Sequence, residues 1–169
     1  LGITHKTVSK WECGMGSPDL TYWPELSSLL GVDMAQLMEG EMALNKPDSG
    51  NIAKIRFYVC SSCGNILVST GGASIVCCGR KLERLSTSDP AEHIKIAVEE
   101  LDDDCYITLD HPMTKKHFIV FAAYVKSDTV FLRRLYPEQS PSFHMPRLSG
   151  GTFYLYCVEH GLSVYPKLF

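Results

Sequence analysis

The sequence has no long uninterrupted run of apolar residues and no surplus of positive charge. A membrane-spanning helix needs about 20 consecutive, mostly apolar residues, so none is expected, and no segment has the character of a secretory signal peptide. Sixteen basic residues stand against 19 acidic ones, for a formal net charge of −3, so any contact with nucleic acid has to come from a local basic patch. No internal repeat is apparent. The hydrophobic content of 45% is ordinary for a globular protein.

Cysteine, in contrast, is abundant, with seven in 169 residues. Four of them crowd into two short clusters, Cys60 with Cys63 and Cys77 with Cys78. An odd total, a C-x-x-C spacing and an adjacent pair favour metal thiolates in a reducing compartment over a secreted disulfide framework. They therefore predict a cytoplasmic location. The remaining three cysteines are Cys13, Cys105 and Cys157.

Residues 1–45 have the pattern of short helices. Thr4 is suited to cap a first helix, Gly31 interrupts the apolar pattern, and Asp33 can cap a short final helix. Pro24 predicts that the helix between them begins late.

The stretch "LGITHKTVSKWECGMGSPDL…LSSLLGVDMAQLMEGE" resembles the second half of a Cro/repressor-type helix-turn-helix domain. The resemblance starts at the turn before the recognition helix, so this part of the chain is a partial DNA-binding domain without the two helices that precede that turn in the family. DNA binding is expected only where the full domain is present. By this resemblance, the residues placed near DNA are Thr4, His5, Lys6, Thr7, Ser9 and Lys10. The alternative is a short helical appendage with no DNA role.

The periodicity changes to that of strands after the linker at 45–51, "NKPDSGN". A second linker, "STSDPAE", separates a small cysteine-containing segment from a longer strand-rich one. The predicted domains are therefore 1–45, 52–86 and 89–169, in a mainly β protein whose last part is a β-sandwich or barrel. The predicted strands lie in "KIRFYVC", "GNILVST", "ASIVCCGRKLERL", "HIKIAVEEL", "CYITLD", "HFIVFAAYV", "TVFLRRLY" and "TFYLYCVEHGL".

The first candidate site consists of the four clustered cysteines, in "YVCSSCGNILVSTGGASIVCCGRKLERL". Four thiolates suit tetrahedral zinc or iron, and Gly64 lets the chain turn so that backbone N–H groups face the sulfurs. The segment resembles a desulforedoxin-type domain, whose CxxCG…CCG pattern binds one iron, and which forms dimers. The resemblance implies that Cys60, Cys63, Cys77 and Cys78 are the iron ligands. Zinc in a purely structural role stays open.

The second candidate site is built from histidines. "HPMTKKH" places His111 and His117 six residues apart, which neither a helix nor a strand can bring together, whereas a loop bent by Pro112 can. "YCVEHGL" places Cys157 and His160 at a spacing that a tight turn presents to one ion. His93 and these four residues together predict a metal site without fixing its geometry.

The motifs "AEHIKI…DHPMTKKHFI…YCVEHGL" resemble those of the superoxide reductase domain, called neelaredoxin alone and desulfoferrodoxin when the cysteine domain precedes it. The resemblance covers 52–169 and implies an immunoglobulin-like sandwich. It also implies an iron with four equatorial imidazoles and one axial thiolate, which reduces superoxide to hydrogen peroxide by one electron. An electron donor such as a rubredoxin-like protein and a homodimer are implied as well. The ligands carried over are His93, His111, His117, His160 and Cys157.

One departure from the family concerns charge. A glutamate and a lysine precede the first histidine in the family, and the lysine attracts superoxide, whereas this chain has Ala91 and Glu92. Lys95, Lys115 or Lys116 is a candidate replacement, and Lys115 and Lys116 lie inside the histidine loop. Two other readings stay open beside the enzyme. One is a redox- or iron-sensing transcriptional regulator with the same metal centres, and the other is electron transfer or structural metal binding without turnover.

Overall fold

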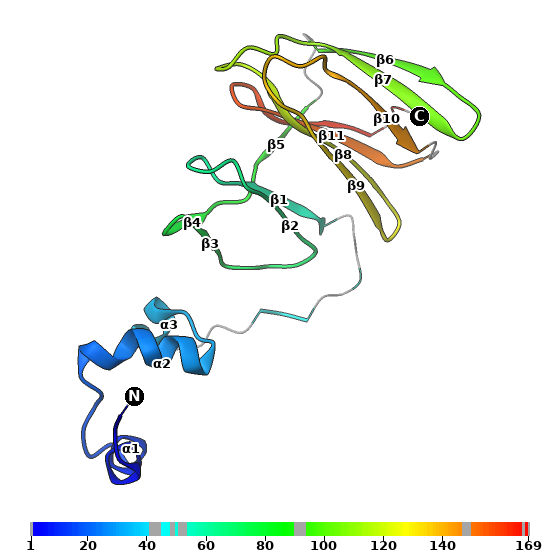
Figure 1. The fold of residues 1–169 in the computed structure, drawn as a ribbon. Helices are drawn as coiled ribbons and strands as arrows, with labels where there is room; N and C mark the ends of the chain where they lie inside the picture. The colour runs from blue at the N-terminus through cyan, green and yellow to red at the C-terminus, as the bar shows by residue number, and fades with distance from the viewer. Residues whose placement is uncertain are drawn as a thin grey trace. The chain divides into compact units, whose positions relative to one another are not determined.

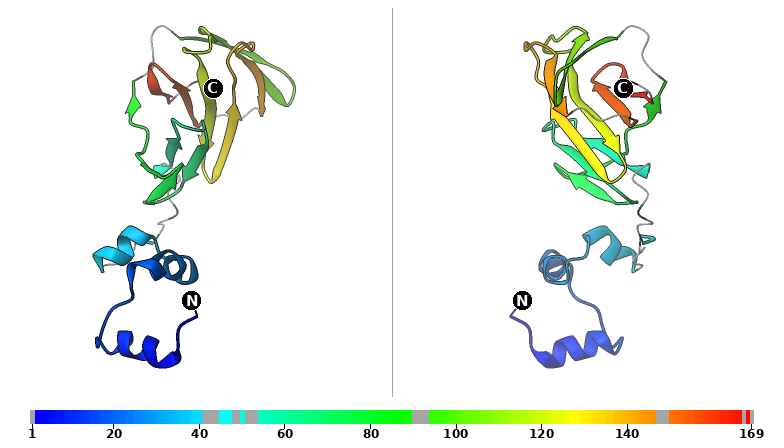
Figure 2. Two further views of the ribbon diagram at one scale, coloured as in Figure 1. Left: turned by 60° about the vertical axis from the view of Figure 1, so that its left-hand side comes forward. Right: turned by 90° about the vertical axis from the view of Figure 1, so that its right-hand side faces the viewer.

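The structure is a computed structural model that describes residues 2–40, 45–47, 50, 54–89, 94–146, 150–166 and 168. The chain divides into two compact units, Leu1–Asn45 and Lys46–Phe169. The first is helical and the second is built of strands, as Figures 1 and 2 show. None of the described helices has the length and apolar character needed to cross a bilayer.

The helical unit contains α1 (His5–Glu12), a 3-10 turn η1 (Leu20–Tyr22), α2 (Trp23–Leu30) and α3 (Met34–Glu39). The predicted caps are confirmed: Thr4 accepts a hydrogen bond from the Thr7 amide, and Asp33 accepts one from the Ala35 amide. Gly31 ends α2 in the left-handed conformation, with φ at 65°. Pro24 occupies the first turn of α2, where the missing N–H costs no helical hydrogen bond.

This helical unit has little core of its own. None of the described residues in its helices is buried, and several large apolar side chains are mostly exposed. Isolated helices of eight residues or fewer are marginal in water. The side chains that are mostly exposed are those of Met15, Leu20, Leu29, Leu30 and Met38, and Met34 is 38% exposed.

The second unit begins with two short hairpins. The strands β1 (Arg56–Val59) and β2 (Ile66–Ser69) form one antiparallel pair, and β3 (Ile75–Cys77) and β4 (Arg80–Leu82) form another. The chain then adds β5 (Thr87–Ser88) in parallel to the edge of a larger sheet, with Thr87 opposite Leu162.

Two further sheets complete the unit. A three-stranded sheet has the order β10-β7-β6, and a five-stranded sheet has the order β5-β12-β11-β8-β9. Figure 1 shows β6, β7 and β10 as one layer and β8, β9 and β11 as the other. The strands are β6 (Lys95–Glu100), β7 (Asp104–Asp110), β8 (Ile119–Lys126), β9 (Thr129–Arg134), β10 (Ser142–Pro146), β11 (Thr152–Cys157) and β12 (Gly161–Tyr165).

The main core lies between these two sheets. Ile107 and Phe143 of the smaller sheet belong to one buried cluster with Ala122, Phe153 and Leu155 of the larger one. Seven consecutive residues of β8, from 119 to 125, are buried. A strand that reads as a continuous apolar run is expected to be covered on both faces, and β8 is.

The second face of β8 is covered by the first hairpin. Phe57 of β1 is 1% exposed and lies in a second buried cluster with Phe121, Ala123 and Leu162. The rings of Phe57 and Phe121 are 5.3 Å apart. The predicted boundary between 52–86 and 89–169 stays a prediction, and apolar packing joins the two segments within Lys46–Phe169.

The sequence patterns missed four strands. The second linker contains β5, and the proline-bounded stretch "PSFHMP" forms β10. The strands β4 and β12 each follow a turn inside a segment that was predicted as one strand. In each case pairing with a neighbouring strand overrides weak local propensity, because β-propensity reflects packing on neighbours more than the backbone itself. Residues 48, 49 and 51 of the first linker lie outside the described residues.

Candidate metal centres

The first cluster of ligand atoms is shaped by two turns. After β1, the Gly64 amide donates to the Cys60 carbonyl over 2.8 Å, and the Cys60 amide donates to the Asn65 carbonyl over 2.9 Å. Gly64 has a φ of 69°, as expected of a glycine that closes a C-x-x-C turn. The turn brings the sulfurs of Cys60 and Cys63 to the same side of the loop.

The second turn is the hairpin between β3 and β4, whose connection is Cys78-Gly79. Both residues have positive φ, 50° and 71°. Two-residue hairpins prefer two such residues, as in the type I′ turn, because that backbone matches the twist of the strands. Cys78 thus adopts a conformation that a non-glycine residue rarely takes, and its sulfur joins that of Cys77 at the end of the hairpin.

All four sulfur atoms lie within 4.8 Å of one another, and Sγ of Cys63 is 3.6 Å from Sγ of Cys77. A tetrahedral ion bound at about 2.3 Å by four thiolates places its sulfurs about 3.8 Å apart, so this set fits such an ion. None of the seven cysteines, all of which lie in described parts of the chain, forms a disulfide.

The surroundings of the sulfurs give the cysteine thiols different pKa values. The backbone N–H groups of Cys63 and Ser62 donate to the Cys60 sulfur and lower its pKa to about 6. Hydrogen bonding with Cys63 and Cys60 raises the pKa of the Cys78 thiol to about 12. A site that stabilises the thiolate of Cys60 while Cys78 keeps its proton is suited to a cation that replaces that proton.

The second cluster begins at the end of β7. His111 directly follows the strand and is 8% exposed. The chain then folds back through a small turn, in which the Thr114 amide donates to the His117 carbonyl over 2.9 Å and the His117 amide donates to Thr114 Oγ1 over 3.0 Å. The rings of His111 and His117 end 4.6 Å apart and nearly perpendicular, at 78°.

The other half of this cluster is the β11–β12 hairpin. Its three-residue connection, 158–160, ends at Gly161, whose φ is 79°. A register shift between Tyr156 and Cys157 sets Cys157 opposite Ile119 instead of Val120. Such bulges re-aim side chains beside functional sites, and here Cys157 is directed into the core at 1% exposure. His160 stays exposed.

The hydrogen-bond partners indicate which ring nitrogen of each histidine faces the cluster. Nδ1 of His111 lies 2.5 Å from the Pro112 carbonyl, which can only accept, so Nδ1 holds the proton and Nε2 holds the lone pair. Nδ1 of His117 lies 3.6 Å from a carboxylate oxygen of Glu159, which favours the same tautomer. Nε2 of His117 faces Nδ1 of His160 at 3.4 Å.

The ligand atoms of His111, His117, Cys157 and His160 all lie within 4.8 Å of one another. Two nitrogens that share an ion at about 2.1 Å are about 3.0 Å apart at a right angle and about 3.4 Å apart in a tetrahedron, so the separation between His117 and His160 fits a shared ion. Three imidazoles and one thiolate are donors that suit iron, zinc or copper.

Other residues singled out from the sequence are placed as follows. His93, Ala91 and Glu92 lie outside the described residues. Lys115 is exposed and lies 3.8 Å from a carboxylate oxygen of Glu138, whereas Lys116 has no carboxylate within 4.0 Å among the described residues.

Among the residues expected near DNA, Thr4, His5, Lys6 and Lys10 are exposed on or beside α1, while Thr7 and Ser9 are half-buried. The Thr4 hydroxyl is used in the helix cap. Glu159 was missed, although its place between Cys157 and His160 was a usable signal.

The fold and these clusters define a β protein with two separate groups of metal-ligand residues, one of four thiols and one of imidazoles and a thiol. No family model matches the chain. A desulfoferrodoxin from Syntrophotalea carbinolica is 34% identical over 118 residues, which cover 64% of this chain and 94% of that protein. A desulfoferrodoxin from Nitratidesulfovibrio vulgaris is 35% identical over 92 residues, covering 50% of this chain and 73% of that protein.

A solved structure also resembles this chain in fold. The superoxide reductase of Treponema pallidum superposes with a TM-score of 0.54 at 18% identity, over 66% of this chain and 97% of that one. The chain belongs to the desulfoferrodoxin family. The predicted mainly β architecture, with helices in the N-terminal part, is confirmed.

Proposed function

We propose that the chain is a superoxide reductase, which reduces superoxide by one electron to hydrogen peroxide at an iron held by His93, His111, His117, His160 and Cys157. The observation that carries this proposal is the cluster of His111, His117, Cys157 and His160, drawn from one loop and one hairpin, with its ligand atoms within 4.8 Å of one another. Membership of the desulfoferrodoxin family supports the same reaction.

Iron bound by this set would supply the single electron that superoxide takes up. The chain's own residues fix the ligand atoms: His111 keeps its proton at Nδ1 on the Pro112 carbonyl, and Glu159 favours the proton at Nδ1 of His117. Burial of Cys157 shields its sulfur from water, whereas His160 is exposed to solvent. The two protons of the product come from solvent, and superoxide is attracted by Lys115 and Lys116.

The four-cysteine cluster is proposed to hold a second iron that exchanges electrons with a donor such as a rubredoxin-like protein. Zinc, which cannot change its oxidation state, would make the same cluster structural. A homodimer is part of the proposal, as the relation to desulforedoxin-type domains implies, and so is a cytoplasmic location, as the cysteine spacing implies.

The test is the metal content and the visible spectrum of the purified protein, followed by superoxide consumption with hydrogen peroxide measured in parallel. We expect two iron ions per chain and about one peroxide per superoxide consumed, as one-electron reduction requires. Zinc in the histidine site, or iron there that superoxide fails to oxidise, would exclude the reductase.

A second candidate is a redox-sensing regulator, in which the metal centres alter DNA binding by the helical unit. It is favoured by one observation: α1 carries exposed Lys6 and Lys10 beside exposed His5. The unit has no buried residue in its described helices, so the test uses a protein in which the two helices that precede this turn in the repressor family are present. Equal operator affinity in the oxidised and reduced states would exclude a regulator.

A further inference from the structure

Arg134, the last residue of β9, lies against the C-x-x-C turn. Its Nη2 atom is 3.1 Å from the position that a Cβ atom would take on Gly64, which directly follows Cys63. The lack of a side chain at Gly64 therefore leaves room for the guanidinium group. The central carbon of this group also lies 5.2 Å from the centre of the Tyr136 ring, within the range of a cation–π contact. These two contacts hold a positive charge beside the four-cysteine cluster.

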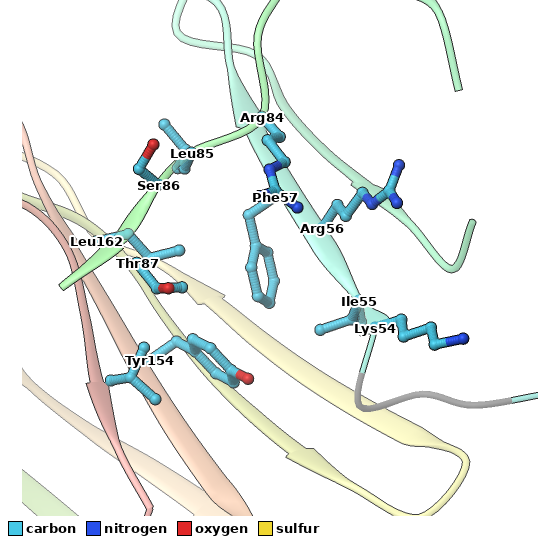
Figure 3. Close-up of a pocket in the computed structure, with 11 residues that line it drawn as sticks. Lys54, Ile55, Arg56, Phe57, Arg84, Leu85, Ser86, Thr87, Tyr154 and Leu162 are labelled. Carbon is cyan, nitrogen blue, oxygen red and sulfur yellow. The ribbon is translucent and has the colours of Figure 1, made fainter. Parts of the chain in front are cut away.

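The register of the larger sheet explains why this arginine faces the turn. Arg134 is paired with Phe121 of β8, and side chains of residues paired across two strands lie on the same face of a sheet. On that face Phe121 packs against Phe57 of the first hairpin, whose ring is directed from β1 toward Tyr154 in Figure 3. Successive side chains of a strand alternate between the faces, so Arg133 extends from the opposite face of β9. Arg134 is thus directed toward the hairpin that carries the turn.

The charge of Arg134 is not offset by a neighbouring acid. Within the described parts of the chain, no carboxylate lies within 4.0 Å of its side chain. Arg134 lines a cavity of about 410 Å³ together with Cys60, Ser61 and Gly64 of the turn, and no acidic residue lines it. The rest of the lining is apolar or aromatic, and charges interact more strongly beside such a surface than in bulk water. Solvent still screens part of this charge, because the side chain is exposed.

We propose that Arg134 raises the reduction potential of iron in the four-cysteine cluster and so favours transfer of an electron from the donor to this centre. Reduction adds one negative charge to an ion that four thiolates already make anionic, and a neighbouring cation stabilises the more negative state. Ferric iron takes up one electron, no bond forms or breaks, and Arg134 keeps its proton. Arg134 is a positioning residue in this step, since it sets the field at the cluster and is not a ligand. The inference rests on the proposed iron in this cluster and is independent of superoxide reduction at the histidine site.

The experiment is a redox titration of the full-length, iron-loaded protein, followed by the visible absorption of the four-thiolate centre. Iron is loaded after other metals are removed, so zinc acquired during expression does not prevent the measurement. At a fixed applied potential we expect Arg134→Gln to lower the ratio of reduced to oxidised iron at least about threefold. This change corresponds to about 28 mV, because a tenfold change is about 59 mV for a one-electron couple. The difference should shrink at high salt as screening increases.

Two further variants separate charge from structure. Arg134→Lys keeps the positive charge and is expected to keep most of the parent potential. Arg133→Gln removes an equal charge from the opposite face of β9, where the side chain is exposed, and is expected to leave the potential unchanged.

Four results would each overturn the proposal. They are the parent potential in Arg134→Gln, an equal shift in Arg133→Gln, an equal shift in Arg134→Lys, and a four-cysteine cluster that takes up no iron. Superoxide consumption is measured separately, so its failure excludes the reductase and leaves this test unaffected.

Discussion

Nε2 of His117 lies 3.4 Å from Nδ1 of His160, although the two residues are 43 positions apart in the chain. The first comes from the loop between β7 and β8, and the second from the turn between β11 and β12. Pairing of β8 with β11 brings this loop and this turn to the same end of the sheet. The candidate iron site is therefore a product of sheet topology.

Removal of the Cys157 thiol is expected to empty the histidine site and spare the four-cysteine site. Cys157→Ala takes away the only sulfur that lies with the ring nitrogens of His111, His117 and His160 in the described chain. Metal analysis should therefore show about half the metal of the parent protein, since one of two centres is lost. Cys105→Ala is the control, because Cys105 is equally buried and lies outside both clusters. Full metal content in Cys157→Ala would contradict the assignment.

Loss of the Glu159 carboxylate is expected to loosen the metal without removing a ligand. The carboxylate lies 3.6 Å from Nδ1 of His117, and partners of this kind typically contribute about 10- to 100-fold in metal affinity. Glu159→Gln should release iron faster to a chelator, as followed by the visible spectrum. Glu138→Gln alters a carboxylate that faces Lys115 instead, and it should release iron at the parent rate. Equal rates of iron release from both variants would show that the Glu159 carboxylate does not stabilise the bound metal.

The two lysines of the histidine loop are expected to differ in their effect on superoxide capture. Glu138 lies 3.8 Å from Lys115 and offsets part of its charge, whereas Lys116 has no such partner among the described residues. Lys116→Met should therefore lower the second-order rate with superoxide more than Lys115→Met. Pulse radiolysis at low ionic strength measures both rates, and the difference should shrink in salt as screening increases. A larger loss of rate in Lys115→Met would show that Lys115 contributes more than Lys116 to the capture of superoxide.

An added methyl group at Gly151 is expected to destabilise the sandwich. A Cβ there would overlap the Tyr124 ring and lie 2.7 Å from the Val125 carbonyl oxygen. Forced overpacking typically costs about 1–3 kcal/mol, so Gly151→Ala should lower the free energy of unfolding in urea by that amount. Gly71→Ala meets nothing within 4 Å and is the control. Unchanged stability of Gly151→Ala would show that the tyrosine moves aside at no cost.

Alkaline pH is expected to destabilise the fold through two half-buried tyrosines. Burial raises the pKa of Tyr154 and of Tyr156 above the ordinary value of 10.0. The unfolded chain then loses these protons first, so stability is full below about pH 10 and declines as the pH rises toward the folded-state pKa values. Unfolding in urea at a series of pH values measures this decline. Tyr154→Phe should make it shallower, and an unchanged decline would point to other groups.

The local chemistry of both candidate centres could be predicted from the sequence. Cysteine spacing, the glycines after each cysteine cluster, and Pro112 in the histidine loop are local features, and short turns are determined mainly by such residues. The helix caps at Thr4 and Asp33 were predictable for the same reason. Resemblance to known motifs supplied the family, and the similarity to desulfoferrodoxins supports that assignment.

What the sequence alone determined was thus the identity of the donor groups and the turns that carry them. The tertiary structure decided which of them meet, the tautomers of His111 and His117, the contact of Glu159 with His117, and the bulge that directs Cys157 inward. It also decided the pairing of β5, β10 and β12 and the contact of Arg134 with the C-x-x-C turn. These features depend on strands far apart in the chain, whose register is set by burial and pairing, which local propensity does not encode.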